Sequence, residues 1–201
     1  MVESGGVVSD KDMREQIIDS AKVIFSRFGF RKTTMNDIAR SLHKAKSSIY
    51  YYFGSKEEIF EEVIRREYTY LKDCLRDALA VEDTPEGRLR AYVLTRLRVL
   101  LQVSNFYGAV TSEYFSYFGL IEKLRKDFVT EEVQLFRGIL QEGVETGVFE
   151  IRNVDETART VITALKGLEY EWATATDRSE LETHVRSILN MVLYGIVARN
   201  S

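Results

Sequence analysis

Residues 33–59 read TTMNDIARSLHKAKSSIYYYFGSKEEI and carry the strongest structural signal in the chain. Apolar side chains recur there at helical spacing in two short groups, which are Met35, Ile38, Ala39 and Leu42, and then Ala45, Ile49 and Phe53. Thr34 can cap the first group as a helix, with Asp37 in its first turn. His43-Lys44 separates the two groups. Two short helices joined by a tight turn form a helix-turn-helix, which the sequence predicts over residues 34–53.

The segments on either side of this motif also predict helices. An apolar stripe runs along a helix from about Lys11 to Phe28, and Gly29 ends it. The stripe consists of Ile17, Ala21, Ile24, Phe25 and Phe28. After the motif, Ser55 and Glu58 form a capping box for a long helix that runs to about Val81.

Capping residues mark further helices along the chain. Starts are predicted at Thr84-Pro85, at Asn153 with Glu156 and at Ser179 with Glu182, and stops at Gly119 and Gly147. The sequence predicts about nine helices and no convincing strand, since Val148 to Ile151 has no partner run. A single proline agrees with an all-α chain. We expect a flexible tail at 1–10, a helix-turn-helix domain of three helices at 11–65 and a helical domain at 66–201.

Composition excludes several classes of protein. With 201 residues, of which 45% are hydrophobic, the chain can bury a core and is not a disordered polymer. It lacks the roughly 18–20 consecutive apolar residues of a membrane span and shows no secretory signal. Cys74 is the single cysteine, so no internal disulfide can form. We therefore expect a cytoplasmic protein without a membrane partner.

Charge is distributed unevenly along the chain. Residues 22–56 hold eight basic residues and one acidic residue, a net +7, whereas the net charge of the whole chain is −3. The remainder therefore carries −10. A basic end on an acidic body is typical of a small nucleic-acid-binding domain. A solvated charged surface is the alternative explanation, and the helices beneath the charges favour the first.

The last helix of the motif has the composition of a DNA-reading helix. Its buried side is predicted to be Ala45, Ile49 and Phe53, which leaves an outer side without acidic residues. That outer side consists of Lys46, Ser47, Ser48, Tyr50 and Tyr51. Such side chains can bond to base edges and phosphates in the major groove. Lys56, at the start of the next helix, adds a charge for a phosphate.

At this point the chain resembles the TetR family of bacterial transcriptional regulators. The resemblance lies in Thr33-Thr34-Met35-Asn36-Asp37-Ile38-Ala39 and in Ser48-Ile49-Tyr50-Tyr51-Tyr52-Phe53-Gly54-Ser55-Lys56-Glu57-Glu58-Ile59, and it covers about residues 11–65. It implies a homodimer that binds a palindromic operator in double-stranded DNA and represses transcription until a small apolar or aromatic ligand releases it. By position, Thr33 and Thr34 would contact phosphates, Lys46, Ser47, Ser48, Tyr50, Tyr51 and Tyr52 would face the groove, and Lys56 would hold a phosphate.

Four positions depart from the family pattern. The turn reads His43-Lys44-Ala45 where Gly-Val-Ser is usual. Histidine can take a positive φ more readily than a branched residue, so the turn is expected to survive at some strain, but Ala45 cannot cap the recognition helix. Gly54 stands where a lysine is common, which removes one phosphate contact.

The second domain offers a candidate ligand cavity and a candidate dimer surface. Aromatic residues cluster at Phe106, Tyr107, Tyr114, Phe115 and Phe118, with Trp172 later, and they form either core or the lining of an apolar pocket. The last two helices, at about Val154–Ala175 and Ser179–Arg199, carry long apolar faces. The residues expected at the dimer interface are Val161, Leu165, Leu168, Leu189, Leu193 and Ile196.

A different function remains as the alternative: a helical protein that binds or carries a small molecule and does not regulate DNA. Enzyme signatures are absent from the sequence, including His-Glu-x-x-His, Gly-x-Ser-x-Gly and the P-loop. With two histidines and one cysteine, the chain is short of metal ligands and nucleophiles. We therefore expect no enzyme activity, no catalytic residue, no metal and no cofactor.

Overall fold

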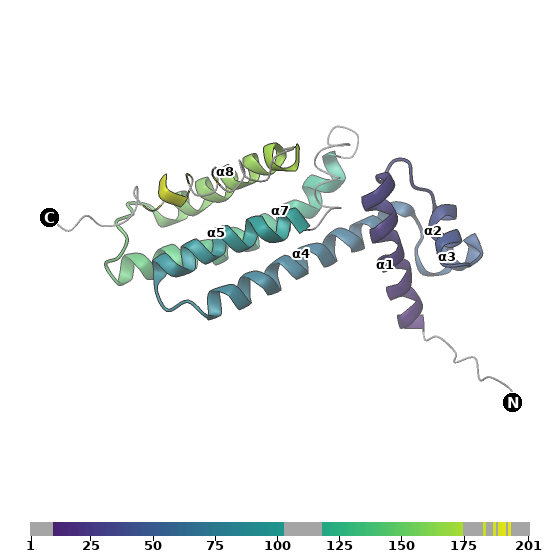
Figure 1. The fold of residues 1–201 in the computed structure, drawn as a ribbon, viewed down its shortest axis with the longest axis horizontal. Helices are drawn as coiled ribbons and strands as arrows, with labels where there is room; N and C mark the ends of the chain where they lie inside the picture. Colours follow the sequence, from purple (N-terminus) through teal and green to yellow (C-terminus); the bar gives the residue numbers. More distant parts are fainter. Residues whose placement is uncertain are drawn as a thin grey trace, which may run out of the picture. The chain divides into compact units, whose positions relative to one another are not determined.

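The computed structural model describes residues 10–102 and 118–174, together with residues 183, 187, 189–191 and 193. The described part contains seven helices with defined bounds, further helical residues at 183, 187, 189–191 and 193, and no strand (Figure 1). The seven helices are α1 (Asp10–Phe28), α2 (Met35–Ser41), α3 (Lys46–Tyr52), α4 (Lys56–Ala80), α5 (Pro85–Gln102), α7 (Phe118–Glu145) and α8 (Val154–Thr174). The all-α prediction is confirmed. The helix predicted at Ser179–Arg199 lies largely outside the described residues.

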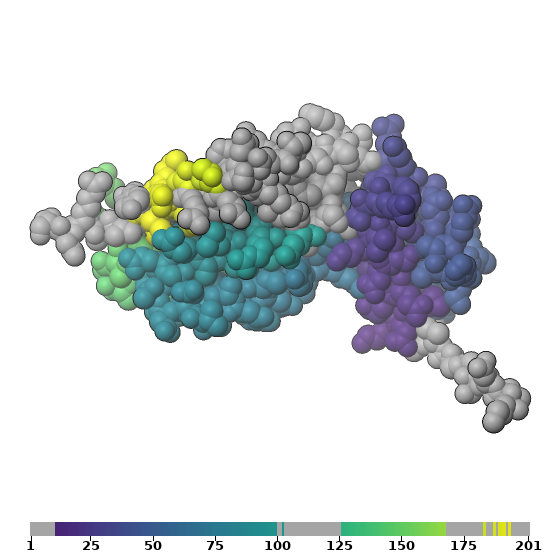
Figure 2. All heavy atoms as spheres, in the orientation of Figure 1, coloured from purple at the N-terminus to yellow at the C-terminus, as the bar shows by residue number. Residues whose placement is uncertain are grey.

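The chain divides into two compact units, residues 1–67 and 68–201, and α4 contributes to both. In the first unit, α1 packs against α2, and α2 packs against α3 (Figure 2). Its core contains three phenylalanine rings, Phe25, Phe30 and Phe60, whose centroids lie 4.5 to 5.5 Å apart. Ile38 on α2 and Ile49 on α3 are also fully buried.

In the second unit, α7 packs against both α5 and α8. The fully buried side chains of this unit include Tyr92 on α5, Phe136 and Leu140 on α7, Ile162 on α8 and Leu75 on α4. The rings of Tyr92 and Phe136 lie 4.9 Å apart. This core therefore depends on contacts between residues that are far apart in the sequence, such as Tyr92 and Phe136.

Helix starts agree with the capping residues read from the sequence. The Oγ1 of Thr34 accepts the Asp37 N–H while the Asp37 carboxylate accepts the Thr34 N–H, which completes a capping box. Thr84 Oγ1 accepts the Gly87 N–H at 3.0 Å.

Two further starts show the same chemistry. Asn153 Oδ1 accepts the Glu156 N–H at 3.0 Å, as predicted for the start of α8. Before α4, Ser55 Oγ accepts the Glu58 N–H at 3.1 Å. The Glu58 carboxylate, however, accepts the N–H of Gly54, so the capping box is shifted by one residue.

Three details of the sequence prediction are wrong. Phe28 is 53% exposed, because Gly29 turns the chain with φ +79° and Phe30 fills the core instead. Ala45 is exposed, since it is the extended N-cap of α3 and its methyl group does not lie on the helix face. Gly119 does not end a helix but lies in the first turn of α7, where backbone N–H groups have no intrahelical partner.

Candidate nucleic-acid interface

The turn between α2 and α3 is closed by backbone hydrogen bonds. Ala39 O accepts the N–H groups of Leu42 and Lys44 at 3.2 and 2.9 Å, and Arg40 O accepts that of His43 at 3.1 Å. His43 has φ +53° and is the sole non-glycine residue with a positive φ in the described part of the chain. The predicted left-handed conformation of this histidine is therefore confirmed, and the helix-turn-helix forms without a glycine.

Helix α3 separates its apolar and polar sides. Ile49 is 0% exposed and Phe53, just after the helix, is 1% exposed. On the other side Tyr50 is 47% and Tyr51 75% exposed, and the Nζ of Lys46 lies 5.5 Å from the centre of the Tyr50 ring. Ser47 is also exposed, whereas Ser48 and Tyr52 are half-buried. The predicted groove-facing residues therefore share one helix, and four of them are open to solvent.

Arg14 on α1 supports the end of α3, which sequence reasoning missed. Its Nη1 donates to the Tyr52 carbonyl at 3.1 Å, and its guanidinium lies 4.2 Å from the centre of the Phe53 ring. A cation at the C-terminus of a helix is favoured by the helix dipole and by the free carbonyls there. No local pattern marks Arg14, because its partners lie 38 residues away.

Thr33 and Lys56 are used inside the unit. Thr33 is 2% exposed and its Oγ1 donates to Gly29 O at 2.8 Å, so its side chain offers no surface to a phosphate. The Lys56 Nζ donates to the carbonyls of Phe30 and Thr33 at 2.8 and 2.9 Å and lies 4.2 Å from the Phe30 ring centre. These bonds hold the loop between α1 and α2 against the start of α4 and occupy two of the three ammonium protons.

Thr34 differs from Thr33 because it is exposed at the N-terminus of α2. Its side-chain hydroxyl and its backbone N–H both donate to the Asp37 carboxylate. These two hydrogen bonds lower the pKa of Asp37, and the charge of Arg40 lowers it further by a smaller amount. The one carboxylate within residues 22–56 therefore serves as a helix cap, while the exposed cations around it leave this surface positive.

The predicted ligand residues of the second unit are only partly described. Phe106, Tyr107, Tyr114 and Phe115 lie outside the described residues, and the side chains of Phe118 and Trp172 do as well.

The residues expected at a dimer interface are also divided. Leu165, Leu189 and Leu193 are 1%, 2% and 8% exposed within a single chain, and Val161 is half-buried. Ile196 and the side chain of Leu168 lie outside the described residues. Because the three buried leucines already pack within the chain, they offer little surface to a second copy.

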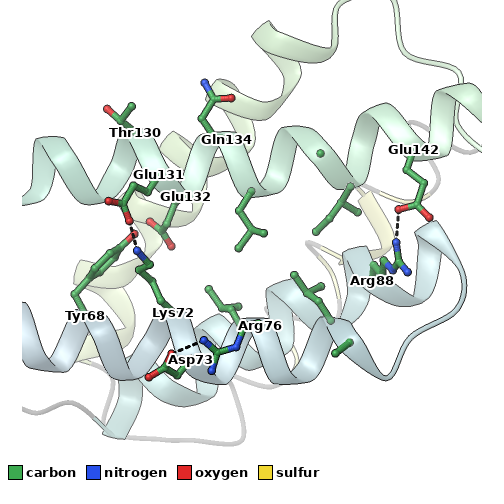
Figure 3. Close-up of a pocket in the computed structure, with 16 residues that line it drawn as sticks. Tyr68, Lys72, Asp73, Arg76, Arg88, Thr130, Glu131, Glu132, Gln134 and Glu142 are labelled. Carbon is green, nitrogen blue, oxygen red and sulfur yellow. Dashed lines mark hydrogen bonds and ion pairs between the residues drawn. The ribbon is translucent and has the colours of Figure 1, made fainter.

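A groove of about 760 Å³ lies between α4 and α7 in the second unit, and it was not predicted (Figure 3). Its apolar lining comes from Leu75, Leu79, Leu135 and Ile139. At its edge Lys72 and Glu131 face one another and form an ion pair of 2.5 Å. The sequence signal for this groove is the four-residue spacing of Leu75 and Leu79, which core packing would produce equally well.

One buried polar cluster adjoins this groove. The Glu132 carboxylate accepts from Arg96 Nε at 2.8 Å and from the Tyr92 hydroxyl at 3.3 Å. Burial first, and then the Glu132 charge, raise the pKa of Tyr92 well above its ordinary value. Nearby, Tyr68 donates to Phe128 O at 2.7 Å, and the two rings stack with their centres 3.8 Å apart.

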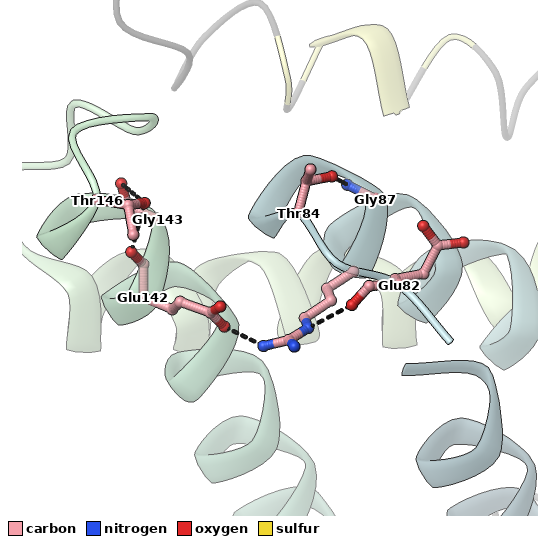
Figure 4. Close-up of polar contacts among 7 residues, drawn as sticks. Glu82, Thr84, Gly87, Glu142, Gly143 and Thr146 are labelled. Carbon is pink, nitrogen blue, oxygen red and sulfur yellow. Dashed lines mark hydrogen bonds and ion pairs between the residues drawn. The ribbon is translucent and has the colours of Figure 1, made fainter. Parts of the chain in front are cut away.

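Arg88 links three segments at the other end of the groove (Figure 3), between the Glu82 and Glu142 that Figure 4 labels. Its Nε donates to Glu82 O at 3.0 Å, in the connection between α4 and α5, and its Nη1 pairs with the Glu142 carboxylate on α7 at 2.5 Å.

No described helix is long and apolar enough to cross a membrane, and no group of metal-binding side chains occurs among the described residues.

Comparisons with known proteins agree with this geometry. The sequence pattern of the family described as "Bacterial regulatory proteins, tetR family" matches residues 17–63. The chain is 40% identical over 63 residues to the biofilm operon icaADBC HTH-type negative transcriptional regulator IcaR of Staphylococcus aureus (strain Newman). That match covers 31% of this chain and 34% of IcaR, so it spans about a third of the curated relative's length.

Solved structures resemble more than nine-tenths of the chain. A transcriptional regulator from Cytophaga hutchinsonii is 30% identical with a TM-score of 0.75, and the likeness covers 92% of this chain and 98% of that one. A transcriptional regulator from Saccharomonospora viridis, solved in complex with choline, is 24% identical with a TM-score of 0.79 and covers 94% and 100% of the two chains.

Proposed function

Because the chain belongs to the TetR family of bacterial transcriptional regulators, we propose that it is a homodimeric repressor that binds a palindromic operator in the cytoplasm. Members of this family are transcription factors, so the chain is a regulator and not an enzyme.

The observation that carries this proposal is the solvent-exposed side of α3. Lys46, Ser47, Tyr50 and Tyr51 project from one short helix whose other side is held by Ile49 and Phe53. Lysine, serine and tyrosine can donate to base edges and phosphates, and tyrosine can also contact a thymine methyl group. In the proposed complex Thr34 and the third proton of Lys56 meet phosphates, whereas Thr33 acts by positioning the loop.

Selection from random duplex DNA tests this function. The chain is expected to enrich an inverted repeat whose half-sites lie about one helical turn apart. The variants Tyr51→Ala and Lys46→Gln are each expected to weaken binding by about 1–3 kcal/mol. Tyr70→Ala is the matched control, because Tyr70 is also exposed (50%) but lies in the second unit. Enrichment of no repeat, or equal losses in Tyr70→Ala and Tyr51→Ala, would contradict the proposal.

We further propose that a small molecule bound in the second unit releases the operator. A groove of about 760 Å³ has the size of a drug-sized ligand site, and α4, which lines it, continues into the first unit. The Saccharomonospora relative holds choline, so a protein of this fold accommodates a small molecule.

Filling this groove tests the effector proposal. Leu135, at its edge, is 38% exposed, so Leu135→Trp is expected to preserve folding and operator affinity. A small molecule found by screening to release the unaltered protein from the operator should not release this variant. An effector that releases both proteins equally would place its site elsewhere.

Sedimentation of the free protein and of its operator complex measures the proposed dimer.

A further inference from the structure

The first unit contains a second cavity, of about 500 Å³, between the C-terminal half of α1 and one side of α2. We call it the α1–α2 groove. Val23, Ile24 and Phe28 supply its apolar surface, and Val23 and Phe28 are 64% and 53% exposed. Large apolar side chains that line a cavity and remain open to water indicate a binding site more strongly than isolated ones do.

The edge of the α1–α2 groove is basic. Arg27, Lys32 and Arg40 line it, and all three are exposed. None of the ion pairs among the described residues involves these three cations, although Arg40 is close enough to Asp37 for its charge to lower the pKa of that carboxyl. The one acidic residue in the lining, Asp37, already accepts hydrogen bonds from the N–H and the hydroxyl of Thr34. The groove therefore combines an apolar floor with an excess of positive charge.

We propose that the α1–α2 groove binds a small organic anion, an aryl or alkyl carboxylate, with its apolar body against Val23 and Phe28. Lys32 and Arg40 hold its carboxylate. Charge complementarity selects an anion, since guanidinium and ammonium groups donate strongly to carboxylate oxygens. The small size of the groove selects a small molecule. A stable protein–protein interface buries about 800 Å² of surface on each partner, whereas two side chains, Val23 and Phe28, supply the exposed apolar surface here.

This site is separate from the groove between α4 and α7, since the two cavities share no lining residue. A consequence rests on the proposed function: the anion weakens operator binding, because Lys32 and Arg40 belong to the basic surface that attracts phosphate. The binding itself does not depend on that function.

Amide chemical shifts of the isotope-labelled full chain test the proposal, with phenylbutyrate as the probe and its uncharged amide as the matched ligand. Phenylbutyrate is expected to shift amides within residues 23–41, and its uncharged amide is expected to bind at least about fivefold more weakly. The double variant Lys32→Gln/Arg40→Gln should weaken phenylbutyrate similarly. Lys72→Gln/Arg76→Gln, which removes two exposed cations from the other groove, should leave the affinity at residues 23–41 unchanged.

Three results overturn the proposal. They are the absence of shifts within residues 23–41, equal affinities of the acid and the amide, and an unchanged affinity in Lys32→Gln/Arg40→Gln. An acidic peptide with one phenylalanine that binds the same amides more than about tenfold tighter than phenylbutyrate would assign the groove to a protein partner instead. Failure of operator selection together with specific phenylbutyrate binding would refute the proposed function and leave this site standing.

Discussion

Gly143 on α7 has almost no room for a side chain. A Cβ added there would lie 1.9 Å from Cδ2 of Phe149, which is itself buried at 3% exposure. The backbone of Phe149 is also tied to the Gly143 carbonyl by a 2.9 Å hydrogen bond, so the ring cannot easily move away. The close packing of Phe149 on α7 therefore requires glycine.

We expect Gly143→Ala to lower the free energy of unfolding by about 1–3 kcal/mol, as overpacking does in a well-filled core. Gly138→Ala, on the same helix with no atom within 4 Å of the added Cβ, is the control and should raise it by about 0.5–1 kcal/mol. Denaturant unfolding of both variants measures the difference. Equal effects would show that Phe149 is not packed against Gly143.

His43 holds the turn of the helix-turn-helix at φ +53°. A β-branched residue is strained in this conformation, and glycine is not. We expect His43→Val to destabilise the protein by about 1–2 kcal/mol and His43→Gly to be neutral or stabilising by less than about 1 kcal/mol. Thermal unfolding tests the order glycine, histidine, valine, and a valine variant as stable as the parent would contradict it.

At the scale of elements, helix ends are determined by short-range chemistry. The Thr34–Asp37, Thr84–Gly87 and Asn153–Glu156 contacts each span three residues and were readable from the sequence. Helix α3 is the exception, since Ala45 gives no side-chain cap. Its other end instead depends on Arg14, so the helix that we propose to read DNA is stabilised by α1 rather than by its own sequence.

The cap of α2 also predicts a dependence on pH. The pKa of Asp37 lies below its ordinary value of 3.8, so the folded protein binds this proton more weakly than the unfolded chain does. The contribution of Asp37 is therefore complete above pH 3.8 and is lost as the pH falls through the lower folded value. We expect the difference in melting temperature between the parent and Asp37→Asn to stay constant from about pH 6 to about pH 5 and to shrink as the pH falls below about 4. A difference that grows on acidification would contradict the capping role.

At the scale of the whole molecule, the second unit depends on a buried ion pair between α5 and α7. Arg96 and Glu132 are 2% and 5% exposed, with Nε and Oε1 2.8 Å apart. We expect Arg96→Leu to cost about 3–5 kcal/mol of unfolding free energy, because it leaves the Glu132 carboxylate buried without its cation. The double variant Arg96→Leu/Glu132→Leu should recover most of that loss. Additive losses in the double variant would show that Arg96 and Glu132 stabilise the protein independently, which would contradict this account.

The sequence alone determined the helical class, the helix-turn-helix and most helix starts of this protein. Periodicity and capping involve residues three to eight positions apart, so they can be read without a fold. It also marked the outer side of α3, because the buried Ile49 and Phe53 leave Lys46, Tyr50 and Tyr51 on the opposite side.

Only the tertiary structure assigned Arg14 to the end of α3. It showed that the side chains of Thr33 and Lys56 bond within the first unit and that Phe28 lies on the surface of that unit. It also revealed both grooves and the Arg96–Glu132 pair. These features join residues that are distant in the sequence, such as Arg14 and Tyr52 at a separation of 38. No local pattern encodes them, because burial and pairing at that distance depend on how the helices pack.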